Sequence, residues 1–262
     1  MGGSRLDFDS LGQTLDCGQC FRWEKTPDGA WEGAAGGNFL RITRENLTEI
    51  LSADFWRDYF DMGTDYEKLR EEFGAMDPVL REAARFAPEI RILRQEPWEA
   101  LGSFLLSQCN NIKRIKGMVA RLCREYGEPC SGGFSAFPRP EALARLQPED
   151  LRRLGFGYRA EYLVGSAREI ASGSVRLEEV RGLPIPEARA ELMKLPGVGV
   201  KVADCALLYG LHRLDAFPMD VWMKRTMAAL FPGRQPESFG PYAGIAQQYL
   251  FHYSRNHPEL FR

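Results

Sequence analysis

The sequence predicts an α+β protein that is mainly α-helical, with a small antiparallel sheet near its N-terminus. Residues 5 to about 50 hold short apolar segments separated by clusters of turn-forming residues, which is typical of a small antiparallel sheet. From Asp54 almost to the end, apolar residues recur at helical spacing, and several expected helices open with proline. We therefore expect a β region over residues 1–52 and a helical region over residues 53–262. No repeat of fixed period indicates a solenoid.

The expected strands follow one another closely along the chain. Segments 20–24, 31–34 and 39–43 are separated by Thr-Pro-Asp-Gly at 26–29 and Gly-Gly-Asn at 36–38, which favour tight turns. A sheet of this size holds little core of its own. We therefore expect it to depend partly on packing against the chain that follows.

Short segments that contain glycine or proline separate the expected helices. Proline at the first helical position marks several of their starts, because its missing N–H is not needed there. The expected helices cover residues 67–73, 78–86, 97–108, 112–126, 140–146, 148–154, 160–171, 186–195 and 200–211, with another opening at Asp220.

Composition narrows the class of protein. The chain has 262 residues, of which 44% are hydrophobic, and this is enough for a substantial core. No run of about 18 apolar residues occurs, so no membrane partner is expected. The first residues include no apolar signal segment. We expect a cytoplasmic protein, nucleoid-associated if prokaryotic, that acts as a monomer.

Charge is unevenly distributed along the chain. The net formal charge is only −2, but residues 44–99 carry 8 basic and 14 acidic side chains, whereas residues 108–168 carry 11 basic and 6 acidic ones. One side of the molecule is therefore suited to face phosphates. Ordinary solvated helix faces would explain the same counts.

The six cysteines do not predict a metal site. Cys17 and Cys20 form a Cys-x-x-Cys pair, but no second pair of cysteines or histidines stands at ligand spacing. No cysteine follows Cys205 in the sequence, so we expect no C-terminal four-cysteine iron–sulfur cluster. We expect neither a metal nor a cofactor.

The most informative stretch is a glycine-rich hairpin between two apolar helical segments. Gly197 and Gly199 are expected to let the backbone adopt positive φ and approach a ligand closely. The helix that follows points unpaired N–H groups outward, which suits a phosphate. Lys201 falls in its first turn, where the helix macrodipole and partial desolvation both favour a neutral, nucleophilic amine. Asp220 lies 19 residues later, at the expected N-cap of the next helix.

The segment Leu-Pro-Gly-Val-Gly-Val-Lys-Val-Ala-Asp-Cys, followed at this interval by Pro-x-Asp-Val, resembles the helix-hairpin-helix DNA glycosylases, and among them the 8-oxoguanine DNA glycosylase/AP lyase family. The resemblance implies two helical lobes around a cleft, with Lys201 attacking C1′ of the damaged nucleotide and Asp220 assisting. Taken alone, the two residues could simply contact a phosphate and cap a helix.

Two further segments resemble the family's contacts around the opposite strand. Ser-Gln-Cys-Asn-Asn-Ile-Lys-Arg at 107–114 is similar to the family's SSNNNIxR, in which the first Asn fills the gap left by the flipped base and the Arg contacts the orphaned cytosine. Arg114 matches that Arg, whereas Cys109 replaces the first Asn, so we expect Asn110 or a neighbour to take over part of its role. Gly-Phe-Gly-Tyr-Arg-Ala at 155–160 is similar to GLGYRARY. The resemblance makes Tyr158 a wedge and Arg159 a second cytosine contact.

Two segments resemble the family's pocket for the damaged base. Gly18 begins Gly-Gln-Cys-Phe-Arg-Trp, similar to GQSFRW, in which the glycine carbonyl accepts from N7–H, a hydrogen that 8-oxoguanine has and guanine lacks. Gln247 and Phe251 lie in a segment similar to GPYAGWAQAVLF, where the Gln reads the Watson–Crick edge and the Phe stacks on the base. Cys205 is expected to cover the other face of the base, and Pro218 to line the pocket.

One position near Asp220 departs from the family pattern. Trp222 stands where animal members usually carry His, so phosphate positioning beside the lesion is expected to differ. Together the matched segments predict an enzyme that excises 8-oxoguanine, preferably opposite cytosine, from double-stranded DNA by way of a Lys Schiff base, and then nicks the strand. A monofunctional glycosylase for alkylated bases and a non-enzymatic DNA-binding module remain alternatives.

Overall fold

Residues 6–261 are described by the computed structural model of the chain. Near the N-terminus, strands β1 (Trp23–Lys25), β2 (Trp31–Ala35) and β3 (Asn38–Ile42) form an antiparallel sheet in the order β1-β2-β3. Gly33 of β2 pairs with Trp23 on one side and with Leu40 on the other. The predicted sheet is therefore confirmed, and the two turn-forming clusters connect its strands.

The rest of the described chain is helical, as predicted. Fifteen α-helices are α1 (Gly12–Leu15), α2 (Leu47–Ile50), α3 (Asp54–Tyr59), α4 (Tyr66–Met76), α5 (Pro78–Phe86), α6 (Pro97–Leu106), α7 (Ile112–Tyr126), α8 (Pro140–Ala144), α9 (Pro148–Arg153), α10 (Arg159–Ala171), α11 (Leu177–Val180), α12 (Ile185–Leu192), α13 (Val200–Cys205), α14 (Val221–Leu230) and α15 (Ala243–Asn256) in residues 6–261. A π turn (Ala206–Gly210) continues α13, and short 3-10 segments lie at Ser131–Gly133, Pro236–Tyr242 and Pro258–Phe261.

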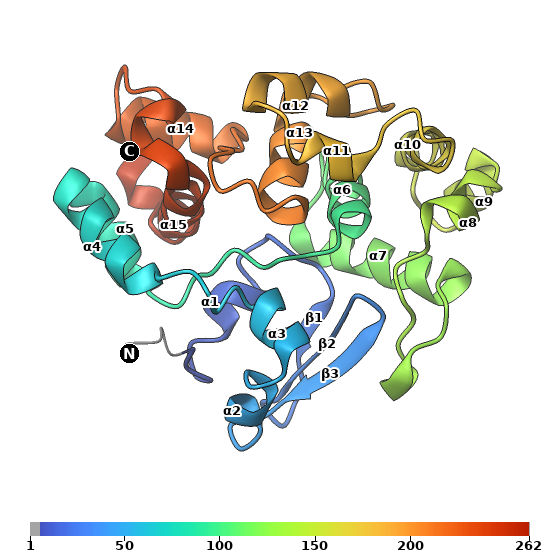
Figure 1. The fold of residues 1–262 in the computed structure, drawn as a ribbon, viewed down its shortest axis with the longest axis horizontal. Coiled ribbons are helices and arrows are strands. Elements are labelled where there is room, and N and C mark those ends of the chain that lie inside the picture. Colours follow the sequence, from blue (N-terminus) through green and yellow to red (C-terminus); the bar gives the residue numbers. More distant parts are fainter. Residues whose placement is uncertain (1–5, 262) are drawn as a thin grey trace.

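From α4 onward most helices lie above the sheet in two groups, whereas α1, α2 and α3 lie at the level of the sheet (Figure 1). In Figure 1, α4, α5, α14 and α15 lie together on the left and α7 to α10 on the right, with α6 and α13 between them and the sheet below. This arrangement brings together segments that are far apart in the sequence: the loop before β1, the start of α7, α13 and α15.

The sheet shares its core with residues beyond the predicted boundary at residue 52. Its apolar cluster includes Trp23 and Ile42 from the strands, but also Tyr59, Phe60 and Leu93 from later in the chain. The dependence on later packing is therefore observed. The boundary itself stays a prediction, and residues 1–5 and Arg262 of the two predicted regions lie outside the described residues.

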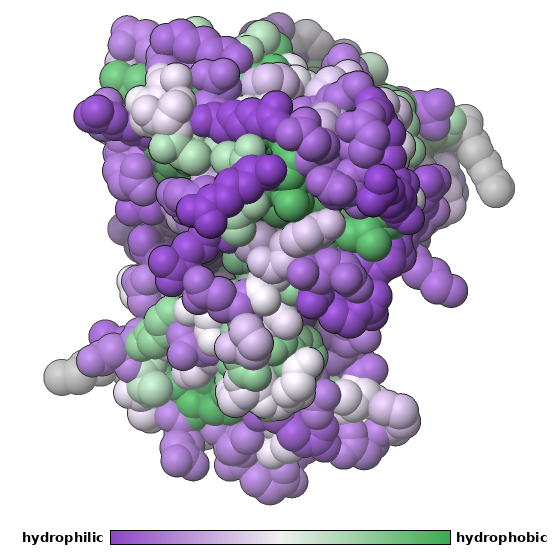
Figure 2. Space-filling model, turned by 90° about the vertical axis from the view of Figure 1, so that its right-hand side faces the viewer, coloured by the Kyte–Doolittle hydropathy of each residue, from purple (hydrophilic) through white to green (hydrophobic). Residues whose placement is uncertain are grey.

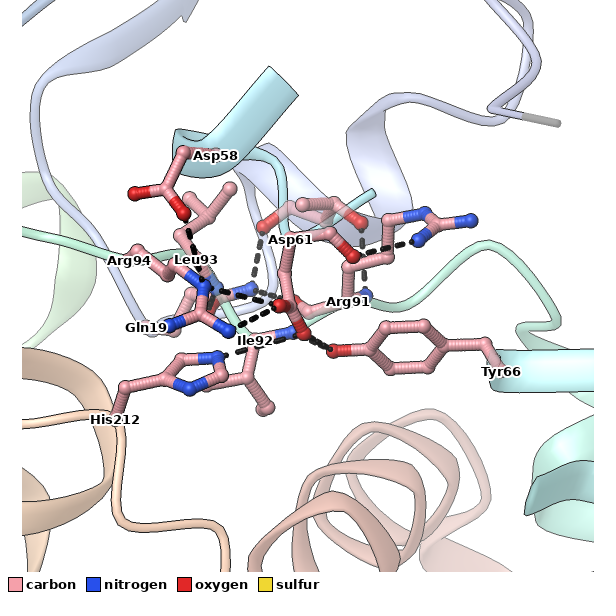
Figure 3. A network of polar contacts seen from close by, with 10 residues as sticks. Gln19, Asp58, Asp61, Tyr66, Arg91, Ile92, Leu93, Arg94 and His212 are labelled. Carbon is pink, nitrogen blue, oxygen red and sulfur yellow. Dashed lines mark hydrogen bonds and ion pairs between the residues drawn. The ribbon is translucent and has the colours of Figure 1, made fainter. Parts of the chain in front are cut away.

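A buried polar network is centred on Asp61 (Figure 3). The Asp61 side chain, 1% exposed, accepts from the Tyr66 hydroxyl at 2.8 Å and pairs with Arg94 Nη2 at 3.0 Å and with His212 Nε2 at 3.4 Å. Burial by itself raises the pKa of Asp61, but the contacts with His212 and Tyr66 outweigh it, so the pKa lies below its usual value. Asp61 thus remains ionised and ties the loop before α4 to the residues after α13.

Gln19 connects the loop before β1 to the neighbouring 91–95 segment. Its amide nitrogen donates to the carbonyls of Thr14 (2.9 Å) and Arg91 (2.7 Å), and its oxygen accepts from Leu93 N (2.9 Å). The side chain is fully buried. Because all of these bonds are buried, they fix the backbone of this loop against the 91–95 segment.

The face of the molecule on the right of Figure 1 is largely hydrophilic, with apolar side chains scattered in it (Figure 2). Several of the basic residues predicted to face phosphates are engaged in ion pairs, including Arg139 with Glu128 and Arg152 with Glu149. Their charge is therefore partly neutralised locally. No helix within residues 6–261 is long and apolar enough to cross a bilayer.

Candidate active site

The hairpin forms between α12 and α13, as predicted, but its two glycines differ. Gly197 has φ 78°, and a Cβ there would lie 2.3 Å from Cγ of Tyr162. Gly199 has φ −94° and ψ 179°, which any residue adopts, and it is the N-cap residue of α13. The expectation of positive φ is therefore wrong for Gly199, because only the first turn position needs the left-handed conformation.

This difference predicts unequal effects of alanine at the two positions. Gly197→Ala is expected to lower the free energy of unfolding by about 2 kcal/mol or more, because it combines left-handed strain with a clash against a partly buried ring. Gly199→Ala meets no atom within 4 Å and is expected to change it little. Urea denaturation of the two variants measures both values. Equal losses would contradict the assigned backbone geometry.

Lys201 lies in the first turn of α13 and points toward α6. Its Nζ donates to Ser107 Oγ at 3.1 Å and lies 5.1 Å from the ring centroid of Phe104. No ion pair of Lys201 occurs among residues 6–261, and its side chain is half-buried. A hydroxyl and an aromatic face hold the amine in place without supplying a counter-charge, so it remains available for a substrate.

Asp220 is the N-cap residue of α14, which confirms this prediction. Its Oδ1 accepts from Met223 N at 2.8 Å. Within the described part of the chain its second carboxylate oxygen makes no hydrogen bond. Since a cap needs only one oxygen, the other is left for the site.

A cavity of about 430 Å³ brings the predicted pocket residues together. Its size is suitable for a small ligand, and its lining is mixed, with aromatic faces and a few polar groups. The lining residues are Gly18, Phe21, Phe104, Ser107, Asn110, Asn111, Ile112, Ile115, Lys201, Cys205, Tyr209, Pro218, Asp220, Trp222, Gln247, Phe251 and Arg255. The two predicted catalytic residues and the five predicted pocket residues therefore line one cavity.

Gly18 forms a narrow part of this cavity. It has φ 91°, and a Cβ added there would lie 3.5 Å from Ile112 Cδ1 and 3.7 Å from Phe251 Cε1. The left-handed backbone favours glycine at this position, whereas the neighbouring side chains would meet a Cβ only at ordinary van der Waals distance. Its backbone is therefore within reach of a ligand in the cavity.

Cys205 and Trp222 contribute apolar walls. Burial raises the pKa of the Cys205 thiol to about 11, although Lys201 nearby lowers it slightly. The thiol is therefore neutral at pH 7 and presents a polarisable surface rather than a nucleophile. The Trp222 ring lies edge-on to Phe261 at 5.8 Å, so the last described turn of the chain packs against it.

A second group of predicted residues forms the turn between α6 and α7. Cys109 at its tip is exposed and has φ 48°, a conformation that is uncommon outside glycine. Arg159, only 4% exposed, donates to the carbonyls of Gln108 (2.9 Å) and Cys109 (3.1 Å) and lies under the Tyr158 ring. Gln108 in turn donates to the Gly197 carbonyl at 3.1 Å. Arg159 thus holds this turn, and its predicted contact with cytosine stays a prediction.

Arg114 is differently placed. It lies in the first turn of α7, whose N-cap Asn111 accepts from Arg114 N at 3.0 Å. The side chain is exposed and forms no ion pair with a residue of the described chain. Its neighbour Lys113 is also exposed. These two cations are therefore free to contact an anionic partner near Cys109 and Tyr158.

Eight lining residues were not predicted as site residues, among them Phe104, Ser107, Tyr209 and Arg255. Phe104, Ser107 and Tyr209 read as ordinary helix positions, because their roles depend on contacts between α6, α13 and α15. Arg255 could have been found from the sequence, because it lies four residues after Phe251 on the same helix face. Its guanidinium lies 5.3 Å from the Phe251 ring centroid.

Comparison with known proteins assigns the chain to a family. A family model for the N-terminal domain of 8-oxoguanine DNA glycosylase matches residues 6–101, and one for the HhH-GPD superfamily of base excision DNA repair proteins matches residues 103–238. The chain belongs to the 8-oxoguanine DNA glycosylase family. The family resemblance, the helix-hairpin-helix fold and the enzyme class, a DNA N-glycosylase with lyase activity, are thereby confirmed.

Individual relatives agree with this placement. The N-glycosylase/DNA lyase OGG1 of Arabidopsis thaliana is 34% identical over 92% of this chain and 76% of its own length. A structure of MBOgg1 in complex with a low-affinity DNA ligand has a TM-score of 0.87 and 37% identity, covering 97% of this chain and 94% of the other. The Clostridium acetobutylicum 8-oxoguanine glycosylase/lyase, bound to double-stranded DNA with cytosine opposite 8-oxoG, has a TM-score of 0.83 and 33% identity, covering 95% and 92%.

Residues 6–261 contain no group of three or more His, Cys, Asp or Glu arranged to hold a metal ion. Cys17 and Cys20 are both buried as free thiols, and burial raises the pKa of the Cys17 thiol to about 11. Cys17 Sγ lies 3.3 Å from the Thr14 carbonyl. The Cys-x-x-Cys pair is thus a packed part of the loop that carries Gly18.

Proposed function

We propose that this protein removes 8-oxoguanine, preferably opposite cytosine, from double-stranded DNA and then cleaves the strand at the resulting site. The observation that carries the proposal is the single cavity in which Lys201 and Asp220 meet Gly18, Gln247 and Phe251. Its volume of about 430 Å³ suits one flipped base, and enzymes that act on a base must first take it out of the duplex.

The proposed chemistry begins at the Lys201 amine. The neutral Nζ attacks C1′ while the bond from C1′ to the base breaks, and the base leaves with the bonding electrons and takes up a proton. The nitrogen attached to C1′ then gives up one proton, the bond between C1′ and O4′ breaks, and O4′ takes up a proton, which leaves a protonated Schiff base between Nζ and C1′. Loss of a proton from C2′ finally breaks the bond between C3′ and its phosphate oxygen, which nicks the strand by β-elimination.

Asp220 is proposed to stabilise the positive charge that develops on the sugar and to orient Lys201. Two observations support this role: only one carboxylate oxygen of Asp220 is used in capping α14, and Asp220 lines the cavity. A fixed negative charge in a partly desolvated site lowers the energy of an oxocarbenium-like transition state more than that of the neutral substrate. Ser107, whose neutral hydroxyl oxygen accepts from Nζ at 3.1 Å, is proposed to hold the amine in position before DNA binds.

Recognition of the oxidised base is proposed to rest on both sides of the cavity. The Gly18 carbonyl accepts from N7–H, while undamaged guanine would place an N7 lone pair against it, leaving a buried acceptor unpaired at a cost of about 1–3 kcal/mol. Phe251 and Cys205 are proposed to cover the two faces of the base. Gln247 is proposed to read its Watson–Crick edge, and Pro218 to complete the wall.

Recognition of the opposite base is proposed to rest on the turn between α6 and α7. Tyr158 and the Cys109–Asn110 tip would fill the gap that the flipped base leaves, and Arg114 would donate to the orphaned cytosine. Exposure of Arg114 and Tyr158 supports this. Arg159 is proposed as the second cytosine contact, and Gly197, Gly199 and Trp222 as contacts to the DNA backbone.

The opposite-base preference is tested with duplexes that carry 8-oxoguanine opposite each of the four bases. We expect single-turnover excision to be fastest opposite cytosine, and Arg114→Ala to reduce that preference about tenfold, because one bidentate base contact is lost. Lys113→Ala, the matched control, should slow all four substrates similarly. A preference for cytosine that survives in Arg114→Ala would overturn the assignment of Arg114.

A further inference from the structure

Tyr209 occupies an unusual position at the end of α13. The helix widens there into a π turn, in which Leu211 N donates to the Ala206 carbonyl five residues earlier at 2.9 Å. Such turns are rare and frequently occur at functional sites. The Tyr209 ring is 4% exposed, stacks on Phe104 with centroids 5.2 Å apart, and lines the cavity. The ring and its hydroxyl therefore belong to the pocket as well as to the core.

The Tyr209 hydroxyl lies between two buried glutamine amides of α15. Gln248 Oε1 is 2.5 Å from it, and Gln247 Oε1 is 3.4 Å from it. Gln248 Nε2 also donates to the Cys17 carbonyl at 3.3 Å. Because a carbonyl can only accept, the nitrogen of Gln248 must face Cys17 and its oxygen must face Tyr209. The single hydroxyl proton is therefore used for Gln248, the nearer acceptor.

The Tyr209 hydroxyl therefore has no proton left to donate to Gln247. The Tyr209 oxygen presents only lone pairs to the Gln247 amide, and two acceptors facing each other without a proton repel. A half-turn of the amide about its last bond places Nε2 toward Tyr209 as a donor. The Gln247 carbonyl oxygen then faces the cavity. Gln247 is only 3% exposed, so bulk water competes little for these bonds.

We propose that Tyr209 and Gln248 are specificity-determining residues, which hold Gln247 so that it presents an acceptor to the Watson–Crick edge of the base. A fixed acceptor pairs with the N1–H and 2-amino donors of a guanine-type base and opposes the N1 lone pair of an adenine-type base. The inference deepens the proposed function and rests on it, because it concerns the same cavity. Both residues act through Gln247 and are positioning residues.

The same bonds also connect the two recognition walls. Cys17, which accepts from Gln248, directly precedes Gly18, whose carbonyl is proposed to recognise N7–H. On its other side the loop is held by the buried Gln19 bonds seen in Figure 3. Tyr209 therefore links the wall that would sense oxidation to the wall that would sense the purine type.

The test compares excision of 8-oxoguanine with excision of 8-oxoadenine, each opposite cytosine, under single-turnover conditions. In the wild type we expect 8-oxoguanine to be excised much faster. Tyr209→Phe keeps the ring stacking but frees the Gln247 amide to rotate, and it should lower the ratio of the two rates about tenfold. Tyr249→Phe is the matched control. Tyr249 is buried on α15, the helix that carries Gln247 and Gln248, and it does not line the cavity. Its hydroxyl lies 3.4 Å from the Ile90 carbonyl. This variant should leave the ratio unchanged.

Gln248→Met provides a second, independent variant, because it removes both amide bonds at similar volume. It should lower the ratio as Tyr209→Phe does, and the double variant should lower it no further, since the two residues act as one unit. If either variant slows both substrates equally and preserves the ratio, the role is only structural and the inference is overturned. A wild-type protein that excises neither base would instead overturn the proposed function itself.

Discussion

Lys201→Gln is expected to lower the rate of base excision at least about a thousandfold and to remove strand cleavage completely. Glutamine is one bond shorter than lysine and remains polar, but its amide nitrogen has no lone pair available to attack C1′. Quenched single-turnover reactions on an 8-oxoguanine duplex measure the base released and the strand nicked separately. Because Lys201 is partly exposed and makes one hydrogen bond, the variant should fold normally.

Lys224→Gln is the matched control for that experiment. Lys224 is exposed on α14, outside the cavity, so its substitution should leave the rate of excision at saturating protein unchanged. The rate at which Lys201→Gln releases the base distinguishes an amine nucleophile from water. If Lys201→Gln still released the base at the wild-type rate, water would be the nucleophile, as in the alternative of a glycosylase for alkylated bases.

Asp220→Asn is expected to reduce excision by about a hundredfold or more while preserving stability. Asn is as good an N-cap as Asp, so the bond to Met223 N and the start of α14 should persist. Only the charge that is proposed to stabilise the transition state is lost, and preorganised charges of this kind contribute about 10²- to 10³-fold. Single-turnover rates give the catalytic effect, and urea denaturation gives the stability.

Asp220→Ala separates the two roles further. Loss of the cap should lower the free energy of unfolding by about 1 kcal/mol, whereas Asp220→Asn should not. If Asn restored both stability and full activity, Asp220 would be only a helix cap. The carboxylate would then have no place in the mechanism.

Much of the fold followed from local sequence signals. The predicted bounds of α5 and α7 agree with the structure, because Pro78 and the capping Asn111 mark their starts unambiguously. The short helices α1, α2 and α11 were not predicted, since four residues hold too little of a helical period to detect. Sheet and helices were assigned to separate regions, yet Tyr59 and Leu93 pack into the core of the sheet, a contact that only the folded chain reveals.

The site residues that belong to recognisable motifs could be predicted from the sequence. Lys201, Asp220, Gly18 and Gln247 belong to segments whose spacing is visible along the chain, and all four line one cavity. Ser107 and Tyr209 were missed because the roles proposed for them depend on partners 94 and 39 residues away, which leave no periodic pattern in the sequence.

Arg159 illustrates a different limit. A motif placed it near the DNA, but it could not indicate that the guanidinium holds the carbonyls of Gln108 and Cys109 in the structure without DNA. Gly199 is similar, since sequence cannot tell which of two nearby glycines needs positive φ. In both cases the deciding factor is a contact or a dihedral angle rather than residue type.

The central claim is that the Lys201 amine attacks the sugar of an 8-oxoguanine nucleotide. Borohydride added during the reaction reduces a Schiff base to a stable bond, so the protein–DNA adduct can be isolated and its attachment site mapped by mass spectrometry. With 8-oxoguanine opposite cytosine, we expect one adduct, attached to Lys201. Release of the base without any adduct, or attachment to a different residue, would contradict the account.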